Sequence, residues 1–456
     1  MSKKKKTVQE LLEDALISEK EQSYKVPENW IVVRMNSVVD VRDGTHDSPT
    51  YQETGIPLIT SKNLKNGILD FNNVKFISKE AHLEICKRSN VERNDILFAM
   101  IGTIGNPVLI KQISQEFSIK NVALYKPNIQ YISPKYLYYY LQSPKYMNYL
   151  KQNEKGSTQK FVPLNILRNA PLYFPPFNEQ MRIAEKIEQL LNKVEVAKQL
   201  IVEAKETFEF RKSAILDKAF RGDLLNDATF EQTWVALEQV VEFENGDRSS
   251  TYPSTKEIVS EGIPFISTKE LNGKLIEPDG ESKFITIEKF NSLRSGKLQN
   301  NDIIMSIRGS VGKVGIFKTS NKYQTGFINA QLVILRCKEM LNPEFLLLYT
   351  KSHVFKNALE KKITGSAQPQ LSVKELRNVL CSLPSLEIQD RIVHQINSIM
   401  LKMEKEQSII NLAILKLESI KQSILSKVFQ GELGTNEPNE ESAIELLKEI
   451  LLDQIN

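Results

Sequence analysis

Closely spaced histidine, cysteine or acidic residues would indicate a metal or nucleophilic site, and this chain has few of them. The four histidines and three cysteines are His46, His82, His353, His394, Cys86, Cys337 and Cys381. The histidines form no HxxxH or HExxH pattern, so the sequence predicts no histidine-based metal site. The cysteines contain no CxxC pair, which argues against a zinc cluster and a disulfide framework. We expect buried thiols and no metal centre.

Three short motifs have a partial likeness to catalytic signatures. Residues 308–313 (RGSVGK) suggest a phosphate loop, but Val314 stands where a magnesium-binding Ser or Thr should follow. The FPPF motif lacks, at Phe174, the Asp or Asn that accepts from the target amine in amino-group methyltransferases. A single residue separates Asp279 from Glu281, too few for a PD…(D/E)xK nuclease site. These departures predict a chain that is not an enzyme by itself.

The most informative feature is an internal duplication. GIPLITSKNL at 55–64 returns as GIPFISTKEL at 262–271, and NDILFAMIGTIG at 94–105 returns as NDIIMSIRGSVG at 301–312. Further along the chain, similar segments recur in the same order at an offset of about 209 residues. Chance similarity does not keep one order and nearly one offset over most of a chain, so we infer two copies of one unit.

Each copy begins with a globular part of mixed secondary structure. Short apolar runs at 96–101 and 303–307 predict strands, as does the run at 38–41. Aromatic-rich segments at 136–141 and 345–349 predict helices. The sequence therefore predicts the α+β class for both globular parts.

Each copy ends in a long helix. After Pro176 and Pro384, apolar residues recur every 3.5 positions over about five heptads, which indicates a coiled coil, and Gly222 and Gly431 are typical helix ends. Pairing the two matching seams predicts antiparallel helices, with the globular parts at opposite ends and a pseudo-two-fold axis between the copies. A helix of about 40 residues would be roughly 60 Å long.

The chain ends carry a weaker repeat. ELLEDAL at 10–16 is similar to ELLKEIL at 445–451. Either the two ends meet in a nearly circular arrangement, or these are two unrelated amphipathic helices. The predicted divisions are an N-terminal helix (1–22), a first globular domain (23–175), a first spacer helix (176–225), a second globular domain (226–384), a second spacer helix (385–433) and an acidic C-terminal helix (434–456).

Composition and charge narrow the function classes. With 41% hydrophobic and 25% charged residues, and no apolar run of about 18 residues, the sequence predicts no membrane span. A basic start followed by an amphipathic pattern, where a signal peptide would place its apolar stretch, leads us to expect a cytoplasmic protein. The block 23–175 holds 19 Lys and Arg against 12 Asp and Glu, and the block 226–384 holds 20 against 18. This modest excess is compatible with a polyanionic partner.

Two similar blocks held apart at a fixed spacing would suit a bipartite ligand such as DNA. Arginine pairs with guanine and Gln or Asn with adenine, while Ser and Thr are versatile, so polar loop residues are the candidate contacts. Alternatively, the glycine-containing segments only form turns, residues 157–158 and 366–368 cap helices, and the remaining loops are solvated. The candidates are Arg42, Thr45, His46, Lys62, Thr103, Ser157, Thr158, Gln159, Lys160, Arg248, Lys269, Arg308, Ser310, Lys313, Ser366, Gln368 and Gln370.

Several of these motifs together resemble the specificity subunit of type I DNA restriction-modification systems. They are the opening ELLEDAL…YKVPENW, the doubled GIP and ND blocks, the Pro-Pro…EQxRI start of the first helix at 175–183, and its AFRGDL end at 219–224. The resemblance spans essentially the whole chain. The second copy departs from it at Ser385 and Ile388, where the first has Pro176 and Glu179.

The resemblance implies two target-recognition domains that each read one part of an interrupted double-stranded DNA site. It also implies that the helices set the spacer length and dock two modification (methyltransferase) subunits and the restriction (ATP-dependent nuclease and translocase) subunits. S-adenosylmethionine, ATP and Mg would belong to those partners, and this chain would bind no cofactor. The alternatives are a coiled-coil assembly scaffold without direct DNA readout, and a degenerate methyltransferase.

Overall fold

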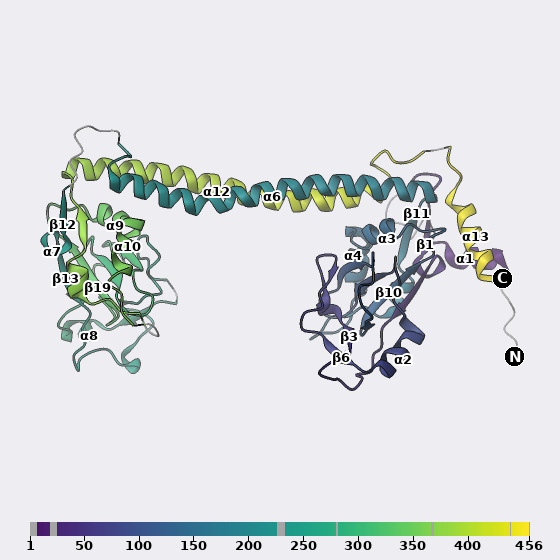
Figure 1. Ribbon diagram of the computed structural model, residues 1–456, viewed down its shortest axis with the longest axis horizontal. Helices are drawn as coiled ribbons and strands as arrows, with labels where there is room; N and C mark the ends of the chain where they lie inside the picture. Colours follow the sequence, from purple (N-terminus) through teal and green to yellow (C-terminus); the bar gives the residue numbers. More distant parts are fainter. Residues whose placement is uncertain are drawn as a thin grey trace. The chain divides into compact units, whose positions relative to one another are not determined.

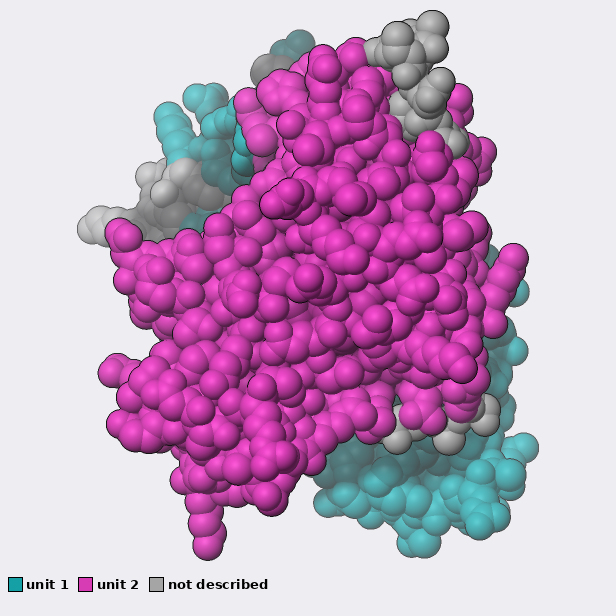
Figure 2. All heavy atoms as spheres, turned by 90° about the vertical axis from the view of Figure 1, so that its left-hand side faces the viewer, with its two compact units in different colours: residues 1–200, 412–456 teal, residues 201–411 magenta. Residues whose placement is uncertain are grey.

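The computed structural model describes residues 7–18, 25–225, 233–279, 281–365, 369–437 and 439–455 (Figure 1). The chain divides into two compact units, shown in different colours in Figure 2. Unit 1 comprises residues 1–200 and 412–456, and unit 2 comprises residues 201–411. The long helices α6 (Phe177–Arg221) and α12 (Leu386–Val428) each contribute a segment to both units.

Unit 1 is built on an antiparallel four-stranded sheet in the order β2-β10-β7-β8. A second sheet, β6-β3-β9, contains one parallel pair, and two further strand pairs are β1-β11 and β4-β5. The strands are β1 (Ile31–Arg34), β2 (Val39–Asp43), β3 (Ile56–Ile59), β4 (Leu64–Lys65), β5 (Ile68–Leu69), β6 (Lys75–Ile77), β7 (Ile96–Ala99), β8 (Gly105–Leu109), β9 (Ser118–Ile119), β10 (Val122–Pro127) and β11 (Pro171–Phe174). The short helices are α1 (Val8–Ala15), α2 (Lys79–Ser89), α3 (Pro134–Tyr140), α4 (Pro144–Asn153), α5 (Leu164–Arg168), α13 (Ala443–Ile455) and the 3₁₀ turns η2 (Met35–Ser37) and η3 (Ser61–Asn63).

Unit 2 repeats this plan with sheets β13-β19-β16-β17, β15-β14-β18 and β12-β20. The strands are β12 (Trp234–Ala236), β13 (Val241–Asn245), β14 (Ile263–Ile266), β15 (Lys283–Ile285), β16 (Ile303–Ser306), β17 (Val314–Ile316), β18 (Phe327–Ile328), β19 (Leu332–Cys337) and β20 (Leu380–Ser382). The helices are α7 (Leu237–Val240), α8 (Ile287–Ser292), α9 (Pro343–Lys351), α10 (His353–Glu360), α11 (Val373–Arg377) and the 3₁₀ turn η4 (Thr255–Glu257).

The backbone confirms the duplication and the α+β class. The matching turns after β7 and β16 place Gly102 and Gly309 at φ 78° and 71°, a conformation that a Cβ makes costly. Asn94 and Asn301, which precede those strands, are also left-handed, at φ 74° and 68°. Gly102 and Gly309 therefore lie in turns, as the alternative interpretation predicted, whereas Gly105 is the first residue of β8.

The long helices pack in antiparallel directions within each unit. In unit 1, Arg182 near the start of α6 donates to Glu440, which follows α12, and Lys198 further along pairs with Glu418 within α12 at 2.7 Å. In unit 2, Leu216 near the end of α6 shares a buried cluster with Ile392 and Ile396 near the start of α12. The helices thus pair as the apolar 3.5-residue repeat predicts.

A buried glutamine attaches each long helix to its globular part. Gln180, which is 0% exposed, accepts from Ser133 N at 2.9 Å and donates to the carbonyls of Tyr131 and Pro175. Gln389 makes the same three bonds, to Asn342 N at 2.8 Å and to the carbonyls of residues 340 and 384. The departures at Ser385 and Ile388 therefore leave the start of the second helix intact.

The first and last described helices meet within unit 1. Helix α1 contacts α13, and Leu12 and Ala15 share one buried cluster with Leu447 and Leu451. The segment before α13 is held by Asn436, which donates to the buried Glu179 at 2.8 Å. These contacts favour the first of the two alternatives, in which the similar terminal segments meet.

Candidate DNA-recognition surface

In unit 2, the turn after β16 lies against residues 369–371, and Gln370 also pairs with Thr364. Arg308 and Gln370 face each other in an isolated antiparallel bridge. Gly309 N donates to Pro369 O, and Leu371 N donates to Ile307 O, both at 2.9 Å. Two candidates 62 positions apart in the sequence are therefore neighbours.

Arg248 adds a second cation to this surface. Its guanidinium donates to Ala330 O at 3.1 Å, and burial together with the nearby charge of Arg308 lowers its pKa. Within the described part of the chain, neither arginine forms an ion pair with a carboxylate. Arg248, Arg308 and Gln370 thus lie in one region in which, among the described residues, no carboxylate pairs with either arginine. A site that binds a base edge or a phosphate of DNA requires such unpaired positive charge.

The remaining unit 2 candidates lie at the edge of this group or apart from it. Lys313 is exposed, and its backbone N donates to Ser306 Oγ at 2.9 Å, while Ser306 Oγ donates to Ser310 O. Lys269 is exposed in the loop after β14, and the structure shows no contact between it and the arginines. Ser366 and Gln368 lie outside the described residues.

In unit 1, the loop after β2 meets the loop after β9. Thr45 forms a parallel bridge with Lys120. His46 contacts Asn121 Oδ1 at 3.0 Å and Asp43 Oδ2 at 2.7 Å through its two ring nitrogens. A hydrogen bond from Lys120 Nζ to Ser48 Oγ closes the loop.

Two other unit 1 candidates have different surroundings. Arg42 lies inside β2 and not in the loop that the sequence suggested, because the strand continues to Asp43. Its side chain donates to Asp40 at 2.7 Å and to Arg88 O at 3.2 Å. Lys62 is exposed on η3, beside Ser61, which donates to Asn121 O at 3.3 Å.

The hairpin at 155–161 carries four exposed candidates next to the turn of Thr103. Gly102 N donates to Lys160 O at 2.8 Å, and Lys160 Nζ pairs with Glu154 at 2.9 Å. Ser157, Thr158 and Gln159 are exposed in the same hairpin. The helix-capping alternative is wrong, because the N-caps of α5 and α11 are Pro163 and Ser372.

The sequence reasoning missed several residues of these surfaces. Lys75 Nζ lies 4.0 Å from the centre of the Tyr51 ring, and the Ser48 hydrogen bond together with nearby Lys120 lowers the pKa of Tyr51. Lys120 and Asn121 in unit 1 and residues 329–331 in unit 2 were also overlooked. The sequence does contain a signal for residues 120–121 and 329–331, because in each copy these polar residues separate two apolar segments that form strands.

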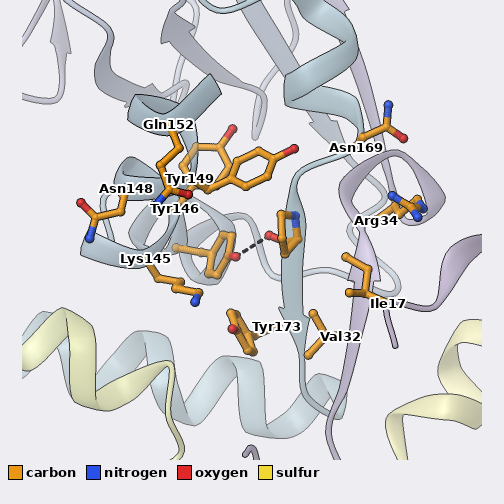
Figure 3. Close-up of a pocket in the computed structure, with 12 residues that line it drawn as sticks. Ile17, Val32, Arg34, Lys145, Tyr146, Asn148, Tyr149, Gln152, Asn169 and Tyr173 are labelled. Atoms are coloured by element: carbon orange, nitrogen blue, oxygen red, sulfur yellow. Dashed lines mark hydrogen bonds between the residues drawn. The ribbon is translucent and has the colours of Figure 1, made fainter. Parts of the chain in front are cut away.

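A pocket of 460 Å³ lies beside β1, β11 and α4 in unit 1 (Figure 3). Its walls include Tyr146, Tyr149 and Tyr173, and Tyr140 donates a hydrogen bond to Pro171 O across it (Figure 3). None of the predicted DNA contacts lines it. Among the described residues no group of three or more acidic, His or Cys side chains could hold a metal, and no helix there could cross a membrane.

Comparison with known proteins assigns the family. A sequence model of the type I restriction modification DNA specificity domain matches the chain twice, over residues 27–206 and 231–414. These matches cover most of the chain, which therefore belongs to this family. It is a DNA sequence-specificity subunit, the non-catalytic component of a type I restriction-modification system.

Similar proteins come from bacteria and archaea. The EcoBI specificity subunit of Escherichia coli is 24% identical over 435 residues, covering 90% of this chain and 87% of its own. The MjaVIII specificity subunit of Methanocaldococcus jannaschii is 24% identical, with 91% and 95% covered.

Solved structures share the fold. The HsdS subunit of Thermoanaerobacter tengcongensis has a TM-score of 0.56 at 22% identity, covering 91% of this chain and 100% of that chain. A chain from a study of type I R-M complex assembly has a TM-score of 0.65 at 21% identity, covering 90% and 100%.

Proposed function

We propose that the two globular blocks each read one part of an interrupted double-stranded DNA site. The main support for this proposal is a difference in residue type between the two units at equivalent backbone positions. Where unit 1 pairs Ile101, just after β7, with Phe161 of the hairpin at 155–161, unit 2 pairs Arg308 with Gln370. The scaffold tolerates both pairs, so this polar pair is available for reading bases, with Arg suited to guanine and Gln to adenine.

We further propose that α6 and α12 set the spacer length and dock two modification subunits and the restriction subunits. S-adenosylmethionine, ATP and Mg would be bound by those partners, which supply methyl transfer and ATP-driven cleavage. The family membership and the antiparallel helix pairing support this division of labour.

The sharpest test of modular reading replaces residues 226–384 with a second copy of residues 23–175. Because both units share one scaffold, the variant should direct its modification subunits to a site whose two halves are the same sequence in inverted orientation. Mapping methylated adenines in a host that lacks other methyltransferases measures the outcome. An unaltered site, or methylation without a bipartite pattern, would contradict modular reading.

Arg308→Ala tests the leading base contact. If Arg308 pairs with guanine, the variant should lose about 1–3 kcal/mol of affinity and relax the site only in the half read by unit 2. If it contacts phosphate, affinity should fall uniformly and the salt slope by about one. Affinity, salt slope and methylated sequence that all match the wild type would remove Arg308 from the recognition surface.

The purified chain by itself should transfer no methyl group from labelled S-adenosylmethionine to DNA and should cleave no DNA. Adding the modification subunits should restore methyl transfer. The physical reason is that the motifs for cofactor binding and amine acceptance are incomplete in the sequence. Methyl transfer by a chain freed of all partner subunits would overturn this assignment.

A further inference from the structure

Unit 2 also contains a basic pocket, and none of its lining residues is among the candidate DNA contacts. A pocket of 770 Å³ is lined by residues of α6, the loop after β14, α9, α10 and α12. Five lysines contribute to its walls, and they are Lys212, Lys274, Lys318, Lys351 and Lys356. The lining also includes two acids, Glu344 and Glu404, so cations prevail.

Lys351 interacts electrostatically with three of the other four lysines. Its ammonium donates to Gly273 O at 3.0 Å, and the neighbouring chain leaves it only partly exposed. Burial and the charges of Lys274, Lys212 and Lys356 lower its pKa. The lysines therefore repel one another across the pocket, and a bound anion would relieve that repulsion.

Each of the two acids forms an ion pair with one of the lysines. Glu404 pairs with Lys274 at 2.8 Å, and Glu344 pairs with Lys318 at 2.6 Å. Neither ion pair includes Lys351 or Lys356. The pocket is also lined by the buried side chains of Leu216 and Leu347, and such surroundings screen charge less than water does.

The first copy of the unit serves as an internal control. Its equivalent pocket contains Gln142 and Met147 where unit 2 has Lys351 and Lys356. Aligning the Asn-Gly turns at 66–67 and 272–273 places Ile68 opposite Lys274. The fold forms without these three charges, so their gathering in unit 2 is not a requirement of packing.

We propose that the lysine-lined pocket of unit 2 binds phosphate groups, and that these are backbone phosphates of the DNA. Ammonium groups bind phosphate as point charges without base selectivity, so this site contributes affinity and not sequence. The inference rests on the proposed DNA reading, because DNA is the polyanion that this family recognises. Among the described residues, the equivalent pocket of unit 1 is lined by two lysines, Lys198 and Lys421, against five in unit 2. The binding of the two halves of the DNA site is therefore unequal.

The test transplants the unit 1 residues into unit 2 as Lys274→Ile, Lys351→Gln and Lys356→Met. Binding of a duplex carrying the mapped site is measured from 50 to 300 mM salt, with the chain assembled with its modification subunits. The variant should bind about tenfold more weakly at low salt, and its salt slope should fall by about one for each phosphate that it no longer binds. The methylated sequence should stay the same.

Removing the same number of charges at Lys256, Lys283 and Lys322, which are exposed elsewhere in unit 2, provides the matched control and should leave the slope nearly unchanged. Urea unfolding checks that both variants fold. An unchanged salt slope in the transplanted variant would overturn the site, whereas a wild-type complex that binds no DNA would instead overturn the proposed function.

Inorganic triphosphate separates the possible sources of phosphate. Competition between triphosphate and DNA that disappears in the transplanted variant supports the assignment to DNA. Triphosphate binding that the variant loses, without any change in the DNA salt slope, would assign the pocket to a free polyphosphate and overturn the DNA assignment. Failure to assemble with the modification subunits, while the unassembled variant binds DNA as the unassembled wild type does, would indicate an acidic protein segment and likewise overturn it.

Discussion

Deleting one heptad from each long helix is expected to abolish methylation at the original site and to shorten the recognised spacer. Seven residues at 1.5 Å each remove about 10 Å, which is roughly three base pairs of duplex at 3.4 Å per step. Residues 194–200 and 417–423 are the segments to delete, because each contains one partner of the ion pair between Lys198 and Glu418 that joins the two helices. A map of methylated adenines before and after the deletion measures the spacer.

The apolar seam explains why a whole heptad is needed. Seven residues restore the 3.5-residue repeat, so the remaining helices keep their pairing. A four-residue deletion from each helix changes the seam locally and serves as a control that should impair assembly. A heptad deletion that leaves the spacer unchanged would show that the helices do not set it.

Arg336→Met is expected to destabilise unit 2 by about 3–5 kcal/mol, because it leaves a buried carboxylate without its partner. Asp302, which is 0% exposed, accepts two bonds from Arg336, at 2.9 and 2.8 Å. Arg336 also donates to Glu244 at 3.1 Å, so one guanidinium joins β13 and β19 to the turn before β16. Urea unfolding of the full chain, followed by a probe in unit 2, measures the decrease in stability.

The loss of stability in Arg336→Met should also depend on pH. Burial raises the pKa of Asp302 in the wild type, and removing Arg336 should raise it further. Because the folded pKa of this acid exceeds its unfolded value, stability is lost as the pH rises from the unfolded pKa to the folded pKa, so the deficit of the variant should grow over that range and stay constant above it. Adding Asp302→Asn removes the charge and should recover part of the stability. A pH-independent deficit would indicate poorer packing as the cause.

Much of the architecture could be predicted from the sequence, because the features that specify it are local or repeated. The doubled motifs predicted two equivalent units, and matching strands β7 and β16 occur where the apolar runs predicted them. The 3.5-residue repeat predicted the long helices and their antiparallel pairing, since an apolar seam must be buried against a partner. The incomplete state of the catalytic motifs could likewise be recognised from residue types and their spacing.

The tertiary structure alone decided which polar residues share a surface. Arg308 meets Gln370, and His46 meets Asn121, through loops far apart in the chain, and no periodicity encodes that distance. The helix-capping alternative was wrong because backbone geometry determines where a helix begins. The presence of Ser and Thr nearby does not determine that geometry. The lysine pocket of unit 2 likewise arises when residues from five elements converge. Packing against distant segments sets these contacts, so they become visible only once both the sheets and the helices are in place.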